Sequence, residues 1–78
     1  MAIKAYILIE TAVGQTRTVV DTIRSFPGID IVDVVTGPYD IIAVFHADDM
    51  AEIGNLVTEN IHHVDGVLRA VTCIATGN

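Results

Sequence analysis

The two halves of this chain carry the same order of apolar residues and glycine, and they align without a gap. Corresponding positions are Ile3 and Ile41, Ala5 and Ala43, Ile7 and Phe45, Val19 and Val57, Ile23 and Ile61, and Gly28 and Gly66. Each half reads as an apolar run, a segment of helical period, a glycine and a second apolar run. Because an internal repeat usually reflects a repeated structural unit, the chain is predicted to contain two copies of a β-α-β unit.

Four runs rich in Ile and Val have the length of strands and are bounded by Gly, Pro or Asp. They span residues 3–10, 29–36, 40–47 and 67–76. The pair Gly37-Pro38 separates the second run from the third, which is typical of a hairpin turn. The sequence therefore predicts four strands, with the middle two joined directly.

The segments between these runs have the spacing of amphipathic helices. Phe26, Pro27 and Gly28 end the first segment, because proline disfavours helix before it and glycine allows the chain to turn away. Asp49, followed by Glu52 three residues later, resembles a capping box at the start of the second. The predicted apolar faces are Thr16, Val19, Val20 and Ile23 in the first helix, and Met50, Ile53, Val57 and Ile61 in the second.

The resulting order is β-α-β-β-α-β. Right-handed crossovers then place both helices on one face of a four-stranded antiparallel sheet, which is the α+β ferredoxin-like arrangement. A chain of 78 residues is long enough for one domain of this kind, so residues 1–78 are predicted to form a single domain.

The strands carry more apolar residues than one helix-covered face requires. Hydrophobic residues make up 51% of the chain, and residues 41–45 are apolar on both sides of the strand. Alternation along the strands is interpreted as placing Leu68, Ala70, Thr72 and Val34 on the uncovered face. A continuous apolar face is unusual on a soluble monomer, so a homodimer that packs sheet against sheet is predicted.

Charge and composition exclude several functions. The net charge is −6 with only four Lys and Arg residues, which argues against a direct nucleic-acid partner and against binding to an anionic membrane surface. Cys73 is the only cysteine and the histidines are few, so no metal site or other cofactor is predicted. The serine and glycine contexts match no nucleophile or nucleotide motif. A cytoplasmic, non-enzymatic protein is expected.

The hairpin between the second and third strands holds the most unusual residues. Tyr39 and Asp40 follow Gly37, and Asp40 begins an otherwise apolar strand. A free amino acid needs an acceptor for its ammonium group and N–H donors for its carboxylate, and a carboxylate beside a glycine-containing turn can supply both. The alternatives are that Asp40 bonds only its own turn and that Gly37 only permits the turn.

Residues 31–42, which read IVDVVTGPYDII, resemble the hallmark of the effector-binding domain of the leucine-responsive regulator (Lrp/AsnC) family, called RAM. Gly66-Val67 resembles the second signature of the family. The resemblance covers essentially the whole chain and suggests a stand-alone domain without the helix-turn-helix of longer members. It implies sheet-to-sheet dimers, rings of dimers, and amino-acid effectors bound between dimers. The effector cleft is implied to use Gly37, Tyr39, Asp40, Leu68, Ala70 and Thr72.

The sequence thus predicts an amino-acid-binding sensor module that acts as a homo-oligomer. It is expected to modulate amino acid metabolism or transcription through partners such as full-length Lrp/AsnC-type regulators. The alternatives are an ACT-like regulatory module, a small dimeric αβ-barrel enzyme that uses His46 or Asp40, and a structural adaptor without a ligand. The family often has threonine at the positions of Ala70 and Thr72, and Ala70 is apolar here.

Overall fold

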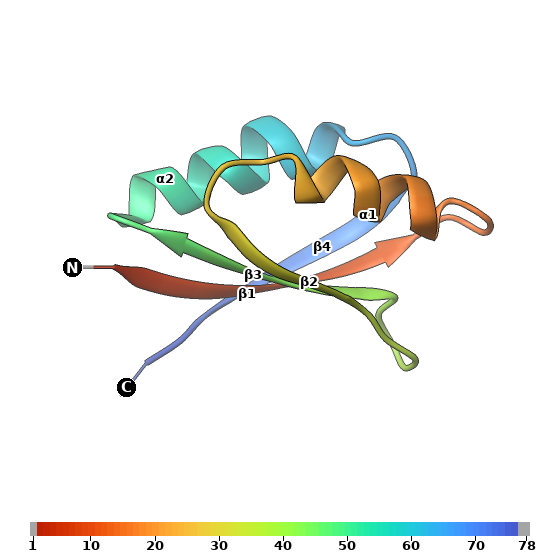
Figure 1. Cartoon of the computed structure of the whole chain (residues 1–78), viewed down its shortest axis with the longest axis horizontal. Helices are drawn as coiled ribbons and strands as arrows, with labels where there is room; N and C mark the ends of the chain where they lie inside the picture. The colour runs from red at the N-terminus through yellow and green to blue at the C-terminus, as the bar shows by residue number, and fades with distance from the viewer. Residues whose placement is uncertain (1, 77–78) are drawn as a thin grey trace.

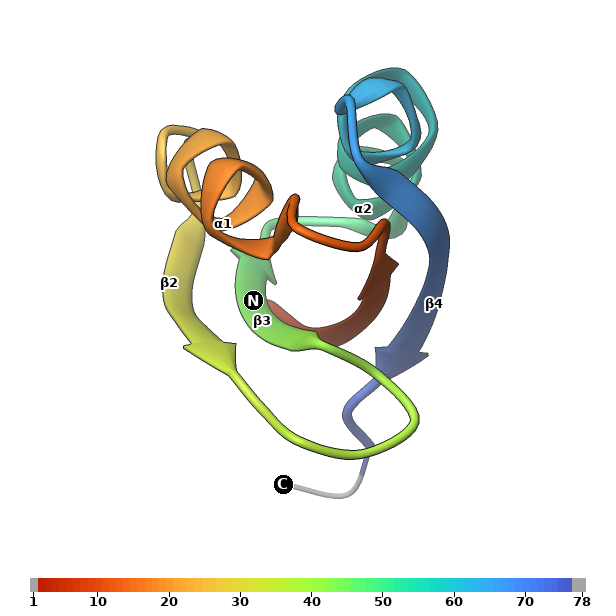
Figure 2. The ribbon, with the colours of Figure 1, turned by 90° about the vertical axis from the view of Figure 1, so that its right-hand side faces the viewer.

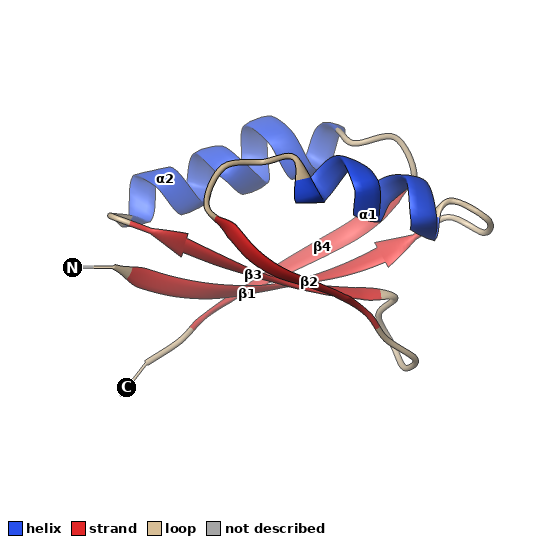
Figure 3. Cartoon of the chain, viewed as in Figure 1, coloured by secondary structure: helices blue, strands red, loops and turns tan. Residues whose placement is uncertain are grey.

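The computed structural model describes residues 2–76 and contains four strands and two helical segments (Figure 1). The elements are β1 (Ile3–Thr11), α1 (Thr16–Arg24), β2 (Ile29–Val34), β3 (Ile41–Ala47), α2 (Met50–Asn55) and β4 (Val67–Ile74). The strands form one antiparallel sheet in the order β2-β3-β1-β4. Both helices cover the same face of this sheet, as Figures 2 and 3 show. The predicted ferredoxin-like α+β fold is confirmed.

The core lies between the helices and the helix-covered face of the sheet. The central strands β1 and β3 pair so that Ile7 lies opposite Ala43 and Ile9 opposite Ile41. The largest fully buried side chains are Ile7, Ile9, Ile23, Ile41, Ile61 and Val19. These residues come from both halves of the repeat, so the two β-α-β units share a single core.

The second helical segment departs from the regular period that the sequence predicts. After Asn55 the chain continues as a π-helical turn, Leu56–Asn60, and a 3-10 turn, Ile61–His63. Leu56 and Ile61 are both buried, and they lie five residues apart, which is the spacing that a π-helical turn places on one face. The predicted capping box is present, because Asp49 Oδ1 accepts a hydrogen bond from Glu52 N (2.9 Å) and Glu52 Oε1 accepts one from Asp48 N (3.0 Å).

Gly28 and Gly66 occupy matching places before β2 and β4, and both have a positive φ, 87° and 98°. At Gly28 the space is also closed, because a Cβ there would overlap the ring of Phe45. The α1–β2 connection is therefore packed directly on the Phe45 ring, and only glycine fits.

We expect Gly28→Ala to lower the free energy of unfolding by about 3 kcal/mol, because backbone strain and overlap with Phe45 add to each other. Gly14→Ala is the matched control, since Gly14 has a φ of 80° but no atom within 4 Å of the added Cβ. Strain alone should cost the control about 1 kcal/mol. Urea unfolding of both variants at one protein concentration measures the difference, and equal losses would contradict the role of Phe45.

Candidate functional site

The β2–β3 hairpin, residues 35–40, projects away from the helices beyond the end of the sheet (Figures 1 and 2). Its base is closed by backbone hydrogen bonds from Val35 N to Asp40 O and from Asp40 N to Ile9 O, both 2.9 Å. At its tip, no atom lies within 4 Å of the position that a Cβ would occupy on Gly37. The tip of the hairpin is therefore open to a ligand or to another subunit.

The Asp40 carboxylate fixes this hairpin to the neighbouring strand rather than to its own turn. Its Oδ2 accepts hydrogen bonds from Thr11 N (2.7 Å) and Thr11 Oγ1 (3.1 Å). Thr11 Oγ1 lies 2.7 Å from Thr16 Oγ1 at the start of α1. Thr11 is 8% exposed while Asp40 is half-buried, so the donors are shielded from water, and the bonds join β1, the start of β3 and α1 at one corner of the sheet.

Tyr39 connects the hairpin to β4 through a residue that the sequence did not single out. Arg69 Nη2 donates a hydrogen bond to the Tyr39 hydroxyl (3.1 Å), and the guanidinium carbon lies 5.6 Å from the centre of the Tyr39 ring. Arginine over an aromatic ring is a favourable arrangement. The contact places one of the few cationic side chains of this acidic chain at the hairpin.

The strand register corrects the interpretation of β4. Ala70 lies opposite Ile9 and Thr72 opposite Ile7, both of which are buried under the helices. Ala70 and Thr72 therefore face the helices, and the expectation that they lie on the uncovered face is wrong. Leu68 has no partner in the register, because the pairing with β1 shifts between Arg69 and Val67, and its side chain is 65% exposed. Alternation separated the two sides of β4 from Arg69 onward, but it could not tell which side the helices cover, and it fails at the register shift, where Val67 packs on the core together with Ala70.

Val34 needs the same correction. It lines a hollow of about 230 Å³ with Arg17, Val20 and Arg24 of α1, so it lies on the helix side of the sheet edge. The side chain is 62% exposed, which explains why it is not part of the core.

The six predicted site residues thus form two groups within one chain. Gly37, Tyr39 and Asp40 lie at the hairpin. Ala70 and Thr72 lie on the helix side of β4, and Leu68 lies at its exposed beginning. Thr72 borders a groove of about 330 Å³ between α2 and β4, together with residues such as Ile53 and Val57. Neither this groove nor the hollow beside Val34 is lined by a hairpin residue.

The uncovered face of the sheet, called the open face below, is largely apolar. Its residues are identified by the register, in which Leu8 lies opposite Ile42 and Val71, and Tyr6 opposite Val44 and Cys73. Tyr6 is 37% exposed and the neighbouring Ile31 46% exposed. Unlike Ala70 and Thr72, these side chains have no helix above them.

Charged groups border the open face at one end. Lys4 Nζ lies 5.0 Å from the centre of the Tyr6 ring, and interaction with the Tyr6 side chain raises the pKa of Lys4 above its ordinary value. His46 Nε2 lies 3.2 Å from Asp30 Oδ2. A polar border around an apolar centre is typical of a protein–protein contact surface.

Two further findings concern residues 2–76 only. No group of three or more His, Cys, Asp or Glu side chains there is arranged to hold a metal ion. Within the same residues, none of the helices has both the length and the apolar character needed to cross a membrane.

Comparison with known proteins gives matches over almost the whole chain. The family model described as the Lrp/AsnC ligand binding domain matches residues 4–78. An uncharacterised HTH-type transcriptional regulator of Pyrococcus horikoshii is 28% identical over 95% of this chain and 47% of its own length. The chain therefore spans about half the length of this regulator.

Solved structures share the fold. The crystal structure of TTHA0845 from Thermus thermophilus is 32% identical, has a TM-score of 0.93, and matches 97% of this chain and 95% of that chain. A transcriptional regulator of Neisseria meningitidis, solved in complex with L-methionine, is 18% identical with a TM-score of 0.88, over 97% of this chain and 51% of that chain.

Proposed function

Because this chain belongs to the Lrp/AsnC ligand-binding domain family, we propose that it is a non-enzymatic sensor module that binds an amino acid between the subunits of a homo-oligomer. Relatives named as transcriptional regulators and a related fold solved with L-methionine support this proposal. The family match favours this function over an ACT-like module. A cytoplasmic location and action through full-length regulators of the same family are part of the proposal.

The first step of the proposal is a dimer formed through the open faces. Leu8 and its partners Ile42 and Val71 form an apolar centre that spans β3, β1 and β4. Burying such a surface is favourable by about 25 cal/mol per Å² before the cost of association is subtracted. The open face of a second copy would supply a cover of matching chemistry.

The second step is a ligand site completed by another subunit. The hairpin is held in place by Asp40, yet the groove that Thr72 borders has no hairpin residue in its lining. This separation is the observation that carries the proposal, because a second subunit can bring the helix side of its β4 to a hairpin that does not reach that side in its own chain. The hairpin tip at Gly37 has the open space that such a contact requires.

The roles in this site follow from the chemistry of its residues. Asp40 bonds Thr11 through Oδ2 and so shapes the hairpin, while its Oδ1 faces a ligand ammonium group. Arg69, held against Tyr39, adds a positive charge near the ligand carboxylate. Thr72 offers a hydroxyl, and Leu68 and Ala70 contact the apolar side chain.

A thermal-shift screen with the twenty amino acids, followed by titration calorimetry, tests the proposal. At least one amino acid should raise the melting temperature saturably, because a ligand bound only by the folded state stabilises it. If none does so while the oligomer is intact, the proposed function is wrong.

The Thr72→Val variant then tests the site itself. Valine keeps the shape of threonine but loses the hydroxyl, so the affinity for the amino acid should fall by about 3- to 10-fold, the value of one hydrogen bond. Thr18→Val, an exposed position on α1, is the control and should bind as the wild type does. Equal affinities for all three proteins would remove Thr72 from the site.

A further inference from the structure

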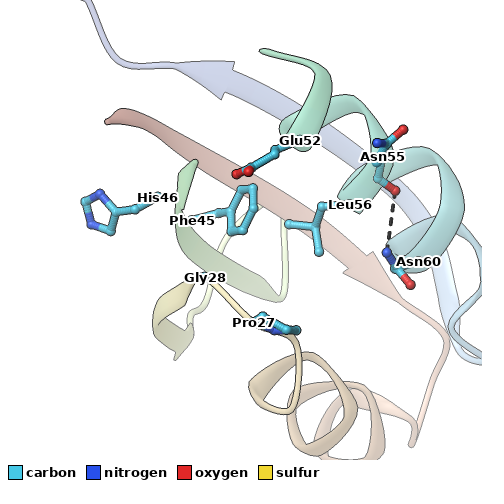
Figure 4. A pocket seen from close by; sticks show the side chains of 8 residues that line it. All are labelled: Pro27, Gly28, Phe45, His46, Glu52, Asn55, Leu56 and Asn60. Carbon is cyan, nitrogen blue, oxygen red and sulfur yellow. Dashed lines mark hydrogen bonds between the residues drawn. The ribbon is translucent and has the colours of Figure 1, made fainter. Parts of the chain in front are cut away.

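The helical segment that begins with α2 has a hollow on each of its two sides. The first hollow, shown in Figure 4, lies toward the α1–β2 connection. Glu52 and Asn60 lie at opposite ends of it, with Leu56 between them. Phe45 and Leu56, which form its floor, are each 5% exposed. This hollow therefore offers a ligand neither converging polar groups nor much apolar surface, and the hollow on the β4 side is the more promising of the two.

The groove between α2 and β4, called the α2–β4 groove below, has apolar walls. Its lining includes Met50, Gly54, Val57 and Thr58 on the helical side and Thr72 and Ile74 on β4. Its volume is about 330 Å³, within the range of small-molecule sites. Within residues 2–76, no charged side chain lines it, and Val57, Thr72 and Ile74 are only half-buried. An apolar group placed here therefore gains contacts on both sides without meeting a charge.

Gly54 lies in the middle of the helical wall, where the fold gives no reason for a glycine. It is not among the glycines with a positive φ, so its backbone conformation suits any residue. No atom lies within 4 Å of the position that a Cβ would occupy on it, so a side chain would meet no obstacle. Glycine inside a helix is less favourable than alanine, because it loses more conformational freedom on folding. The missing side chain thus keeps free space over the groove at a cost in stability, as expected where a ligand occupies that space.

Thr72 connects this groove to the proposed amino-acid site. It lies between Ala70 and Ile74 on the helix side of β4, because alternate residues of a strand share one side. An amino acid whose main chain bonds the Thr72 hydroxyl would have Ala70 beside its first side-chain carbon and the groove ahead of the rest of its side chain. The helical wall from Met50 to Thr58 is roughly 10 Å long, which is enough for an extended side chain.

We propose that the α2–β4 groove holds the side chain of the bound amino acid, and that Gly54 gives the groove the depth to select long, apolar, uncharged side chains. This inference rests on the proposed amino-acid function and adds a specificity to it. The ligand side chain lies over Gly54, between Val57 and Ile74. Met50 covers its end, since a flexible thioether side chain adapts to different shapes. A charged side chain is excluded, because the groove has no opposite charge to pair with it.

Titration of the full chain with L-norleucine, L-alanine and L-lysine, followed by NMR of the backbone amides, tests this selection. Norleucine should bind at least about tenfold more tightly than alanine, because each buried methylene is worth about fourfold. It should exceed lysine, which ends a chain of the same carbons with a charge, by a similar factor. If another class of amino acid binds instead, or norleucine is not preferred, this inference is wrong and the proposed function stands. If no amino acid binds to the intact oligomer, both are wrong.

Two substitutions of Gly54 locate the ligand side chain. Gly54→Leu fills the groove, so norleucine should bind at least about tenfold more weakly while the binding of L-alanine, which does not enter the groove, is unchanged. Gly54→Ala should weaken norleucine binding by about threefold and yet raise the urea midpoint of unfolding, since alanine favours the helix and meets no atom. Ala51→Leu, at an exposed position of α2 that does not line the groove, is the matched control and should bind both ligands as the wild type does. Unchanged norleucine binding in Gly54→Leu, or equal loss of both ligands, would overturn the proposal.

Discussion

Leu8→Glu is expected to convert the proposed dimer into monomers. Leu8 lies in the middle of the open face, opposite Ile42 on β3 and Val71 on β4. A glutamate there would be buried between two sheets without a positive partner, which costs several kcal/mol for each ion. The dissociation constant should therefore rise by about a thousandfold or more, since each 1.4 kcal/mol is worth about tenfold. Sedimentation equilibrium over a range of protein concentrations measures it.

The matched control is Val13→Glu. Val13 is 100% exposed, and it lies in the connection between β1 and α1 and not on a strand of the open face. The change in charge is the same, but no buried contact is altered, so the wild-type oligomer should persist. A monomeric wild type, or a Leu8→Glu variant that still forms dimers, would rule out pairing through the open face and the ligand site between subunits that depends on it.

The topology could be predicted from the sequence because the repeated halves leave few arrangements of four strands and two helices. Gly28 and Gly66 are one pair of matching positions in the repeat. Each precedes a strand, and each has the positive φ at which glycine is favoured. The π-helical turn was missed, because Ile53, Val57 and Ile61 also fit a regular helix in sequence. The structure shows the wider helical period at this turn, because Leu56 and Ile61, five residues apart, are both buried.

The candidate site could be predicted in part. The hairpin residues are recognisable from their types, but the partners that hold them are distant in sequence: Thr11 for Asp40 and Arg69 for Tyr39. Alternation along a strand cannot reveal such contacts, and it cannot show which side of β4 the helices cover. That information lies in the register between strands, which placed Ala70 and Thr72 on the helix side.

Asp40→Ala is expected to lower the free energy of unfolding by about 2–3 kcal/mol, the cost of leaving buried donors without their charged acceptor. The donors are the backbone N–H and the hydroxyl of Thr11, which is 8% exposed. The hairpin should also lose its fixed position, so amino-acid binding should weaken more than it does in Thr72→Val. Urea unfolding at a fixed protein concentration measures the stability, because an oligomer is more stable at higher concentration.

A double-mutant cycle with Thr11→Val separates the bond between the Thr11 hydroxyl and the Asp40 carboxylate from the other effects of removing Asp40. Valine keeps the shape of Thr11 without its hydroxyl, so Thr11→Val should cost less once Asp40 is already alanine, with a coupling of about 1 kcal/mol. Asp21→Ala, at an exposed position of α1, is the control for loss of a charge and should change stability by no more than about 0.5 kcal/mol. Strictly additive effects of Thr11→Val and Asp40→Ala would mean that the hydroxyl and the carboxylate do not interact, and that the bond from Thr11 N alone joins the carboxylate to β1.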